Sequence, residues 1–410
     1  MKKKIFFTFL IVMILACTFA VTVSAKTITT VEGKEVTVTT YDGAPSKTKL
    51  TVSTDDVVVF DDGFACPSAY IFKDTDTISE GDHTGNNGLK NNVDFSYIKE
   101  KTGKTYELSN IVELDIPKGI TKLGKYGFTR LQIKRISIPE TATSIGGCCF
   151  EKCTALKQCV FEHPKESELT SLPAWIFQGC TSLTAFCFPE CIEKINSEYE
   201  FSGCTSLTAV YLPKNLTAYN TSSNNEKSVF YGCTNMYFVN EPFTYDNIPE
   251  KPAVYYMPSG LTSVSGELFK NCNNINETIV FPVGVTQLTN SYAFELKSGS
   301  PSIKNIVFLG DMTSLNTSNW KIAADGKIIF ANKNDKSAAD IPTLSGSHNK
   351  IYCNADGNTV HFVDERGSTL KAPATCVSVA IYDAKCFCGK VLGEINGTEL
   401  DPNNHNFDLE

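Results

Sequence analysis

The chain has 410 residues and a net charge of −8, with 45 aspartates and glutamates against 37 lysines and arginines. An acidic chain is poorly suited to bind nucleic acid or an anionic membrane surface, because both carry negative charge. The length exceeds what one ordinary hydrophobic core supports, so it predicts several domains or a repeat array.

Residues 1–25 are expected to form a secretory signal peptide. Three lysines follow Met1, an uncharged apolar run extends from Ile5 to Val23, and the small residues Ser24 and Ala25 follow. Cleavage after Ala25 removes three lysines and no acidic residue, so the net charge changes from −8 to −11. A membrane anchor or a lipoprotein signal ending at Cys17 stays an alternative. We therefore expect a secreted or cell-surface protein with no transmembrane anchor in the mature chain.

Residues 26–105 do not repeat, and we expect them to form a β-rich cap on the N-terminal end of a repeat array. Thr27–Thr40 and Lys49–Phe60 are rich in threonine and valine with partial alternation, which is typical of strands. Asp61–Asn92 is polar and glycine-rich without an apolar period, which predicts a long loop or disorder. A short helix is predicted over Phe95–Lys101, ended by Gly103.

Residues 106–315 contain a repeated sequence of about nine units. Phe177–Pro189 and Phe201–Pro213 share the pattern F-x-G-C-T-S-L-T-x-Φ-x-Φ-P, where Φ is apolar, and weaker copies begin at Phe150, Phe230 and Phe269. A second short segment of the form G-Φ-T-x-Φ follows the marker proline, as in Gly119–Leu123. Most of the marker prolines recur at steps of about 20–29 residues, the period of leucine-rich repeats.

The residue pattern of each repeat predicts one short strand with one buried face. Val210 and Leu212 alternate with Ala209 and Tyr211, and the proline that follows ends the strand because it cannot donate a hydrogen bond to a neighbour. A single unit cannot bury its own apolar face. Stacked units can, and their strands then form a parallel sheet.

The unit resembles the BspA-type leucine-rich repeat of bacterial and protist surface proteins. The resemblance covers about residues 106–315. It implies a right-handed, β-rich repeat solenoid with a parallel sheet, flanked by small β modules, and a role in adhesion or host contact. Glu241 stands where the pattern has an inward apolar residue, and Asn220–Lys227 is a polar insertion. The array is therefore expected to be irregular between Pro213 and Pro258.

Residues 316–410 are predicted to form a small β module. Asp325-Gly326 and Asp356-Gly357 each lie between apolar stretches, which indicates hairpins. Four residues near the C-terminus could close a tetrahedral zinc site: Cys376, Cys386, Cys388 and His405. A local disulfide in an oxidising exterior is the alternative, and no other cofactor is predicted.

The other cysteines favour a structural interpretation. Five of them occupy the same position in successive repeats, namely Cys153, Cys180, Cys204, Cys233 and Cys272. Cysteine is among the most buried residue types, so we expect these thiols to be reduced, inert and packed in the core. The five histidines belong to no recognisable catalytic motif, which predicts a protein that is not an enzyme.

We predict the binding surface on the solvent side of the parallel sheet. Counting along each strand places an apolar row there, centred on Tyr211, Phe238 and Tyr256 and joined by Ala209, Asn240 and Val254. The alternative is strand propensity alone, since such residues suit exposed strands. The sequence thus predicts a secreted binding protein whose partner is a protein or glycan on a host or neighbouring cell. A secreted enzyme with chemistry in 316–410, or a structural spacer of a larger surface protein, remains an alternative.

Overall fold

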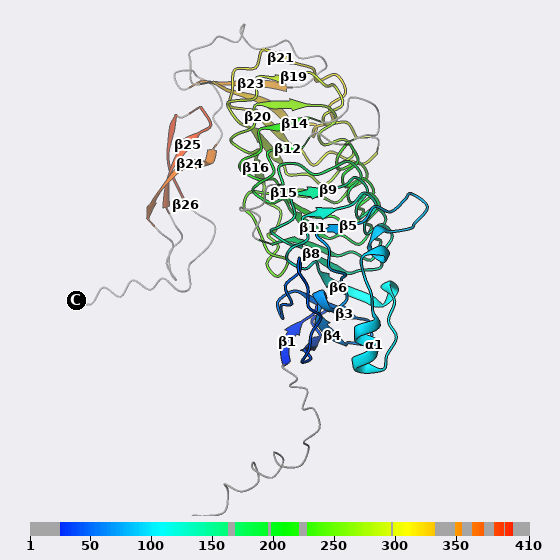
Figure 1. Ribbon diagram of the computed structural model, residues 1–410. Coiled ribbons are helices and arrows are strands. Elements are labelled where there is room, and N and C mark those ends of the chain that lie inside the picture. The colour runs from blue at the N-terminus through cyan, green and yellow to red at the C-terminus, as the bar shows by residue number, and fades with distance from the viewer. Residues whose placement is uncertain are drawn as a thin grey trace, which may run out of the picture.

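The computed structural model describes residues 25–162, 169–195, 198–220, 228–296, 298–332, 349–354, 363–372, 381–388 and 390–396. They form a solenoid of stacked coils with a small antiparallel sheet beside it (Figure 1). The predicted signal peptide lies outside the described residues except for Ala25, which begins the first strand.

Parallel strands make one side of the solenoid, which we call the strand wall, and they confirm the predicted repeat solenoid. They are β6 (Ile111–Asp115), β8 (Arg135–Ile138), β10 (Gln158–Phe161), β11 (Ala185–Cys187), β13 (Ala209–Tyr211), β15 (Tyr237–Val239), β16 (Val254–Tyr256), β18 (Thr278–Phe281), β20 (Asn305–Phe308), β22 (Lys327–Asn332) and β23 (Asn349–Asn354). The wall is not one continuous sheet, because pairing stops between β10 and β11 and again between β15 and β16.

Shorter strands form a second wall, and most of them lie in the G-Φ-T-x-Φ segments that follow a marker proline. They are β5 (Thr77–Ile78), β7 (Lys122–Leu123), β9 (Ser144–Ile145), β12 (Lys194–Ile195), β14 (Ala218–Asn220), β17 (Ser263–Ser265), β19 (Gln287–Leu288) and β21 (Ser314–Leu315). The prediction that the array is irregular is confirmed here. β14 pairs directly with β17, whereas the strand wall gains both β15 and β16 over the same length of chain.

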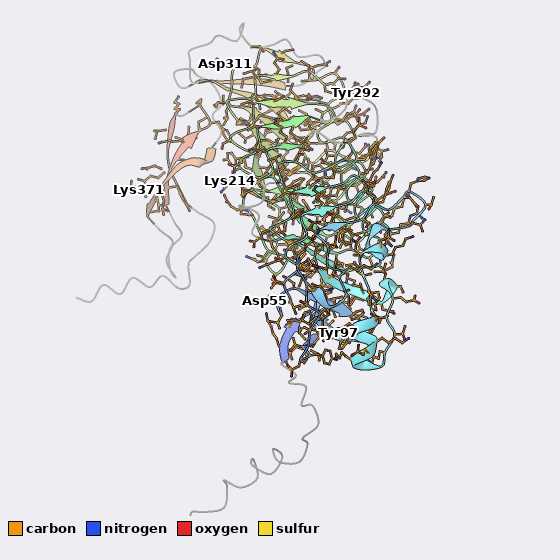
Figure 2. The ribbon with its side chains drawn as sticks, in the orientation of Figure 1. Asp55, Tyr97, Lys214, Tyr292, Asp311 and Lys371 are labelled. Atoms are coloured by element: carbon orange, nitrogen blue, oxygen red, sulfur yellow. The ribbon has the colours of Figure 1, made fainter. Side chains whose placement is uncertain are left out.

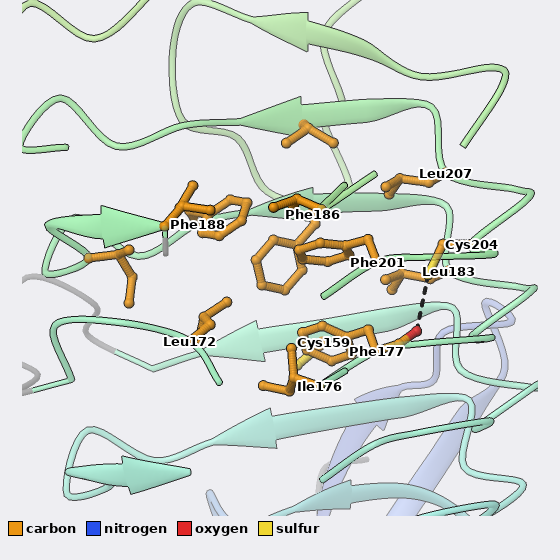
Figure 3. Close-up of a cluster of buried hydrophobic side chains, with 14 of the residues drawn as sticks. Cys159, Leu172, Ile176, Phe177, Leu183, Phe186, Phe188, Phe201, Cys204 and Leu207 are labelled. Carbon is orange, nitrogen blue, oxygen red and sulfur yellow. Dashed lines mark hydrogen bonds between the residues drawn. The ribbon is translucent and has the colours of Figure 1, made fainter. Parts of the chain in front are cut away.

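The interior is filled by the repeated phenylalanines, which stack along the solenoid axis. The ring centroids of Phe150 and Phe177 lie 5.4 Å apart, and those of Phe177 and Phe201 lie 5.2 Å apart. Figure 3 shows Phe177 and Phe201 of this stack together with Leu183 and Leu207 of the same repeats. Because each ring packs on the ring of the next coil, no repeat buries its apolar face alone.

The in-register cysteines line the same interior, as predicted. The thiol of Cys204 donates to the backbone oxygen of Phe177 in the preceding coil at 3.2 Å (Figure 3), and the thiol of Cys180 donates to that of Phe150 at 3.1 Å. Cys153 and Cys233 make the equivalent contact. Four of the five in-register cysteines therefore join two coils through a weak S–H···O hydrogen bond as well as by packing, whereas the thiol of Cys272 contacts the backbone oxygen of Lys270 in its own repeat.

The N-terminal residues extend the strand wall through β1 (Ala25–Thr29), β2 (Glu35–Thr39), β3 (Val57–Phe60) and β4 (Ala65–Pro67). The prediction of a loop or disorder over Asp61–Asn92 is wrong, because β4, β5 and two 3-10 turns lie there. Ile71, Phe72 and Ile78 are buried in the core, and they are too widely spaced to show a period. The predicted helix is confirmed as α1 (Ser96–Thr102), ended by Gly103 with a φ of 72°.

The C-terminal residues continue the wall before forming a separate sheet. β22 pairs in parallel with β20, and β23 pairs in parallel with β22. The array therefore extends beyond residue 315, and the predicted hairpin at Asp325-Gly326 is wrong. That turn joins two coils instead of two antiparallel strands. Asp356-Gly357 lies outside the described residues. An antiparallel sheet follows, with strands β24 (Val363–Ala372), β25 (Ile381–Cys386) and β26 (Val391–Asn396).

Candidate functional site

The outer face of the strand wall points away from the phenylalanine core, and the pairing register decides which side chains lie on it. Val210 and Leu212 point into the core and Ala209 and Tyr211 point outward, as predicted. Val254 and Tyr256 also lie on the outer face.

Phe238 does not lie on the outer face, so that prediction is wrong. It aligns with Val210 in the sheet and stacks on Tyr255 inside the core, with ring centroids 4.8 Å apart. Tyr237 and Val239 take the outer positions. The count failed because Pro242 resembles a strand-ending proline but belongs to a segment that leaves the wall after β15.

That segment, Pro242–Ile248, covers the middle of the outer face. Phe243, Tyr245 and Ile248 pack against the outward side chains of β11, β13 and β15. Ala209 and Tyr211 are consequently buried, with exposed fractions of 0% and 1%. The Tyr211 hydroxyl donates to Glu190, and burial, followed by this hydrogen bond and the charge of Glu190, raises the pKa of Tyr211. The predicted accessible row is therefore closed over at Ala209 and Tyr211 by the chain itself.

Tyr245 fills the first interruption of the wall. Its hydroxyl accepts from the Cys159 amide at 3.1 Å, and it lies 3.0 Å from the backbone oxygens of Cys159 and Ala185. The Tyr245 hydroxyl thus contacts backbone groups of β10 and β11. In a continuous sheet, these groups would form hydrogen bonds with each other. The sequence offered one signal for it: two aromatic residues, Phe243 and Tyr245, in an otherwise polar stretch.

Two asparagines bridge the second interruption, between β15 and β16. The Asn276 side chain accepts from the Phe238 amide and donates to the backbone oxygens of Phe238 and Pro252, each at 2.8 Å. Asn240, predicted as a ligand-binding residue, donates to the backbone oxygen of Val254 and accepts from the Tyr256 amide. Asn240 therefore has a structural role in joining the two strands.

The last part of the outer face is covered by the turn that follows β25. Tyr256 is buried there with Cys386, Phe387 and Cys388 packed against it, and Val254 is partly buried beside it. Cys376 and His405, the other two residues of the predicted zinc site, lie outside the described residues, so that site remains a prediction. Within the described ranges, no group of three or more potential ligands is arranged to hold a metal ion.

An opening remains on the outer face between the hairpin β1–β2 and the segment Pro242–Ile248. Its volume is about 630 Å³. Its floor includes Val160 and Phe161 of β10, and its rim includes Thr30 of the hairpin, Glu190 after β11 and Asp246 of the covering segment. Elements far apart in the sequence therefore enclose it, which is why sequence reasoning missed it.

The wall beside this opening is charged, in contrast to the later strands. Arg135 forms an ion pair with Asp115, whose other oxygen accepts from the Val57 amide. Glu113 accepts from the Val31 amide at 2.7 Å, which fixes the hairpin on the wall. Burial raises the pKa of Glu113 and of Glu162 above the ordinary value of a carboxyl group. The first strands thus carry charged residues where the later strands carry apolar ones.

The repeat thiols are held in their protonated form. Burial raises the pKa of Cys153, Cys204 and Cys272 to about 12, and it raises the pKa of Cys180 and Cys233 well above the ordinary value of a thiol. Only the thiolate is a good nucleophile, so these cysteines should react slowly in the folded protein. We expect alkylation at pH 7.5, mapped by mass spectrometry, to leave Cys180 and Cys204 unlabelled until denaturant is added. Fast labelling of either in the native protein would contradict this assignment.

Stacked parallel strands and an apolar ladder along the solenoid axis define the class: a leucine-rich-repeat solenoid. The BspA type leucine-rich repeat region matches residues 102–237 and 253–336 in six copies, and the chain belongs to this family. The match omits residues 238–252, which contain the segment that leaves the wall. No helix in the described part of the chain is long and apolar enough to cross a membrane.

Several solved structures share similarity with this chain. A leucine-rich-repeat protein of T. pallidum is 23% identical, covering 45% of this chain and 71% of its own, with a TM-score of 0.29. One from Bacteroides ovatus is 15% identical over 82% and 91%, with a TM-score of 0.32. The pneumococcal vaccine antigen PcpA is 13% identical over 80% and 96%, with a TM-score of 0.30. No curated protein shows a significant match.

Proposed function

We propose that this chain is a secreted or cell-surface binding protein without catalytic activity, and that it engages a protein on a host or neighbouring cell. Family membership and the predicted signal peptide support this function. The location of the binding site is inferred from the opening beside β10. Among the described residues, the hairpin, the segment Pro242–Ile248 and the turn after β25 cover other parts of the outer face, and the opening lies between the first two.

The chemistry of the opening favours a protein segment that combines an apolar side chain with a positive charge. Val160 gives the lining an outward apolar side chain, whereas the rings of Phe161 and Phe188, which also border the opening, pack in or against the phenylalanine core. Glu190 and Asp246 supply carboxylates at the rim, and Arg135 of the same lining is paired with Asp115. Small apolar pockets with a few polar groups are typical of binding sites. The acidic character of the whole chain should also speed its encounter with a basic partner.

A single substitution with a matched control tests this site. Val160→Arg places a charged side chain in the floor of the opening, whereas Val283→Arg makes the same change at a valine that is 67% exposed on the turn after β18. We expect partners captured by the wild type from cell-surface and matrix extracts to be retained by Val283→Arg and lost by Val160→Arg, with at least a tenfold weaker affinity for the purified partner. Equal binding by both folded variants would place the site elsewhere.

Two other functions remain as outcomes of experiment. A secreted enzyme would show turnover of protease, esterase or glycosidase substrates that His405→Ala abolishes. If the chain is a structural spacer, the wild type, Val160→Arg and Val283→Arg should all capture no partner.

A further inference from the structure

The later strands of the wall carry a row of apolar side chains on the outer face. Tyr256, Val280, Val307 and Ile329 lie directly opposite one another in successive strands of the pairing register. We call these four residues the apolar strip. All four are buried, with exposed fractions between 0% and 8%. They make no part of the phenylalanine core, which lies on the other side of the wall.

The strip is covered by a turn from the separate C-terminal sheet. Cys386, Phe387 and Cys388 lie against it, and the rings of Phe387 and Tyr256 are 6.3 Å apart. Figures 1 and 2 show that the sheet β24–β26, which carries Lys371, stands beside the solenoid instead of within its stack of coils. The covering residues therefore come from an element that the repeats do not contain.

The contact made by the C-terminal sheet is confined to a small part of its described side chains. Leu370, Val391 and Leu392 of the same sheet are exposed, at 52%, 62% and 37%. A module that was fixed to the solenoid by a broad interface would bury such side chains first, since burial of apolar area is the main stabilising contribution. The turn instead enters the strip as a short ligand would, with one aromatic ring between two small side chains.

We propose that the apolar strip is a second interaction surface, which accepts a protein segment presenting an aromatic side chain at a turn, and that Cys386–Cys388 occupies it in cis as an exchangeable ligand. A contiguous apolar row on the solvent side of a sheet requires a cover. Tethering gives the cis turn a high effective concentration, so an outside segment binds only when it competes with that turn or when the turn leaves. This surface is independent of the opening beside β10.

The full-length chain tests the proposal with a peptide supplied in trans. The probe is a fluorescein-labelled peptide of residues 381–391 in reducing buffer. Phe387→Ser removes the aromatic ring from the cis turn, and Leu392→Ser is the matched control in the same sheet. Removing the competitor should make the peptide bind Phe387→Ser at least tenfold more tightly than it binds the wild type or Leu392→Ser. Phe387→Leu, which keeps an apolar side chain, should give an intermediate affinity.

A second substitution assigns any binding to the strip. Val307→Asp places a charge in the centre of the strip, and combined with Phe387→Ser it should abolish peptide binding, while circular dichroism reports an unchanged fold. The proposal is overturned if folded Phe387→Ser binds the peptide no better than the wild type, or if Val307→Asp leaves that binding intact. Because no variant touches the opening, the outcome is separate from that of Val160→Arg.

Discussion

Raising the pH from 7.5 to 9.5 should lower the free energy of unfolding by roughly 10 kcal/mol, enough to unfold most proteins of ordinary stability. The cause is a set of buried thiols whose pKa is raised well above its ordinary value, chiefly by burial: Cys66, Cys149, Cys153, Cys159, Cys180, Cys204, Cys233 and Cys272. In the unfolded chain the thiol pKa is about 8.5. A raised pKa in the folded state gives stability that is complete below the unfolded pKa and is lost above it.

Each thiol contributes about 1.4 kcal/mol to this loss when the pH exceeds the unfolded pKa by one unit. Urea unfolding followed by circular dichroism at pH 7.5, 8.5 and 9.5, with a phosphine reductant, measures the slope. Cys204→Ala removes one titrating group, so its stability should fall by about 1.4 kcal/mol less over the same range. A free energy of unfolding that stays constant up to pH 9.5 would show that the repeat thiols are not buried as neutral groups.

Replacing Asn276 by leucine should lower the free energy of unfolding by about 4 kcal/mol, because each buried backbone group left without its partner costs about 1–3 kcal/mol. The Asn276 side chain is fully buried and makes three hydrogen bonds to backbone groups on both sides of the break between β15 and β16. Leucine has a similar volume but can make none of these bonds. Urea unfolding at pH 7.5 measures the difference.

Two further substitutions separate hydrogen bonding from packing at this position. Asn276→Asp keeps the acceptor for the Phe238 amide but turns a carboxylate oxygen toward two backbone oxygens, so it should destabilise at least as much as leucine. Asn274→Ala removes an exposed side chain that donates to Asn235, and it should change stability by less than about 0.5 kcal/mol. Equal effects of the Asn274 and Asn276 variants would contradict the bridging role.

The solenoid could be predicted from the sequence because the residues within each repeat are enough to indicate its strand, its turn and its core positions. Phe177, Cys180, Leu183 and Pro189 recur at fixed spacing, and each has a local physical meaning as core filler or strand end. The same reasoning failed where Pro242 imitated a strand-ending proline. Counting back from Pro242 shifted the assignment by one residue, so Phe238 was placed on the outer face and its neighbours in the core. The error follows because successive side chains of a strand point to opposite faces.

The candidate site could not be predicted because its covers come from distant parts of the chain. Nothing near Tyr211 indicates that Phe243 and Tyr245 fold back over it, and nothing near Tyr256 indicates Phe387. Of the residues predicted for the outer row, Ala209, Tyr211, Val254 and Tyr256 do lie on that face, and Phe238 does not. Whether such a row faces solvent or a covering segment is a property of tertiary packing, and periodicity reports only which face a side chain occupies.

We expect the two interruptions of the strand wall to divide the solenoid into units of unfolding as well. Hydrogen-bonded pairing runs from the N-terminal strands to β10, resumes from β11 to β15, and resumes again from β16 to β23. The apolar ladder crosses the first boundary without a break, since Phe150 stacks on Phe177. In a linear array, stability is a sum over units and their interfaces. A terminal block can therefore open while the next keeps its ladder, with the boundaries set at Tyr245 and Asn276.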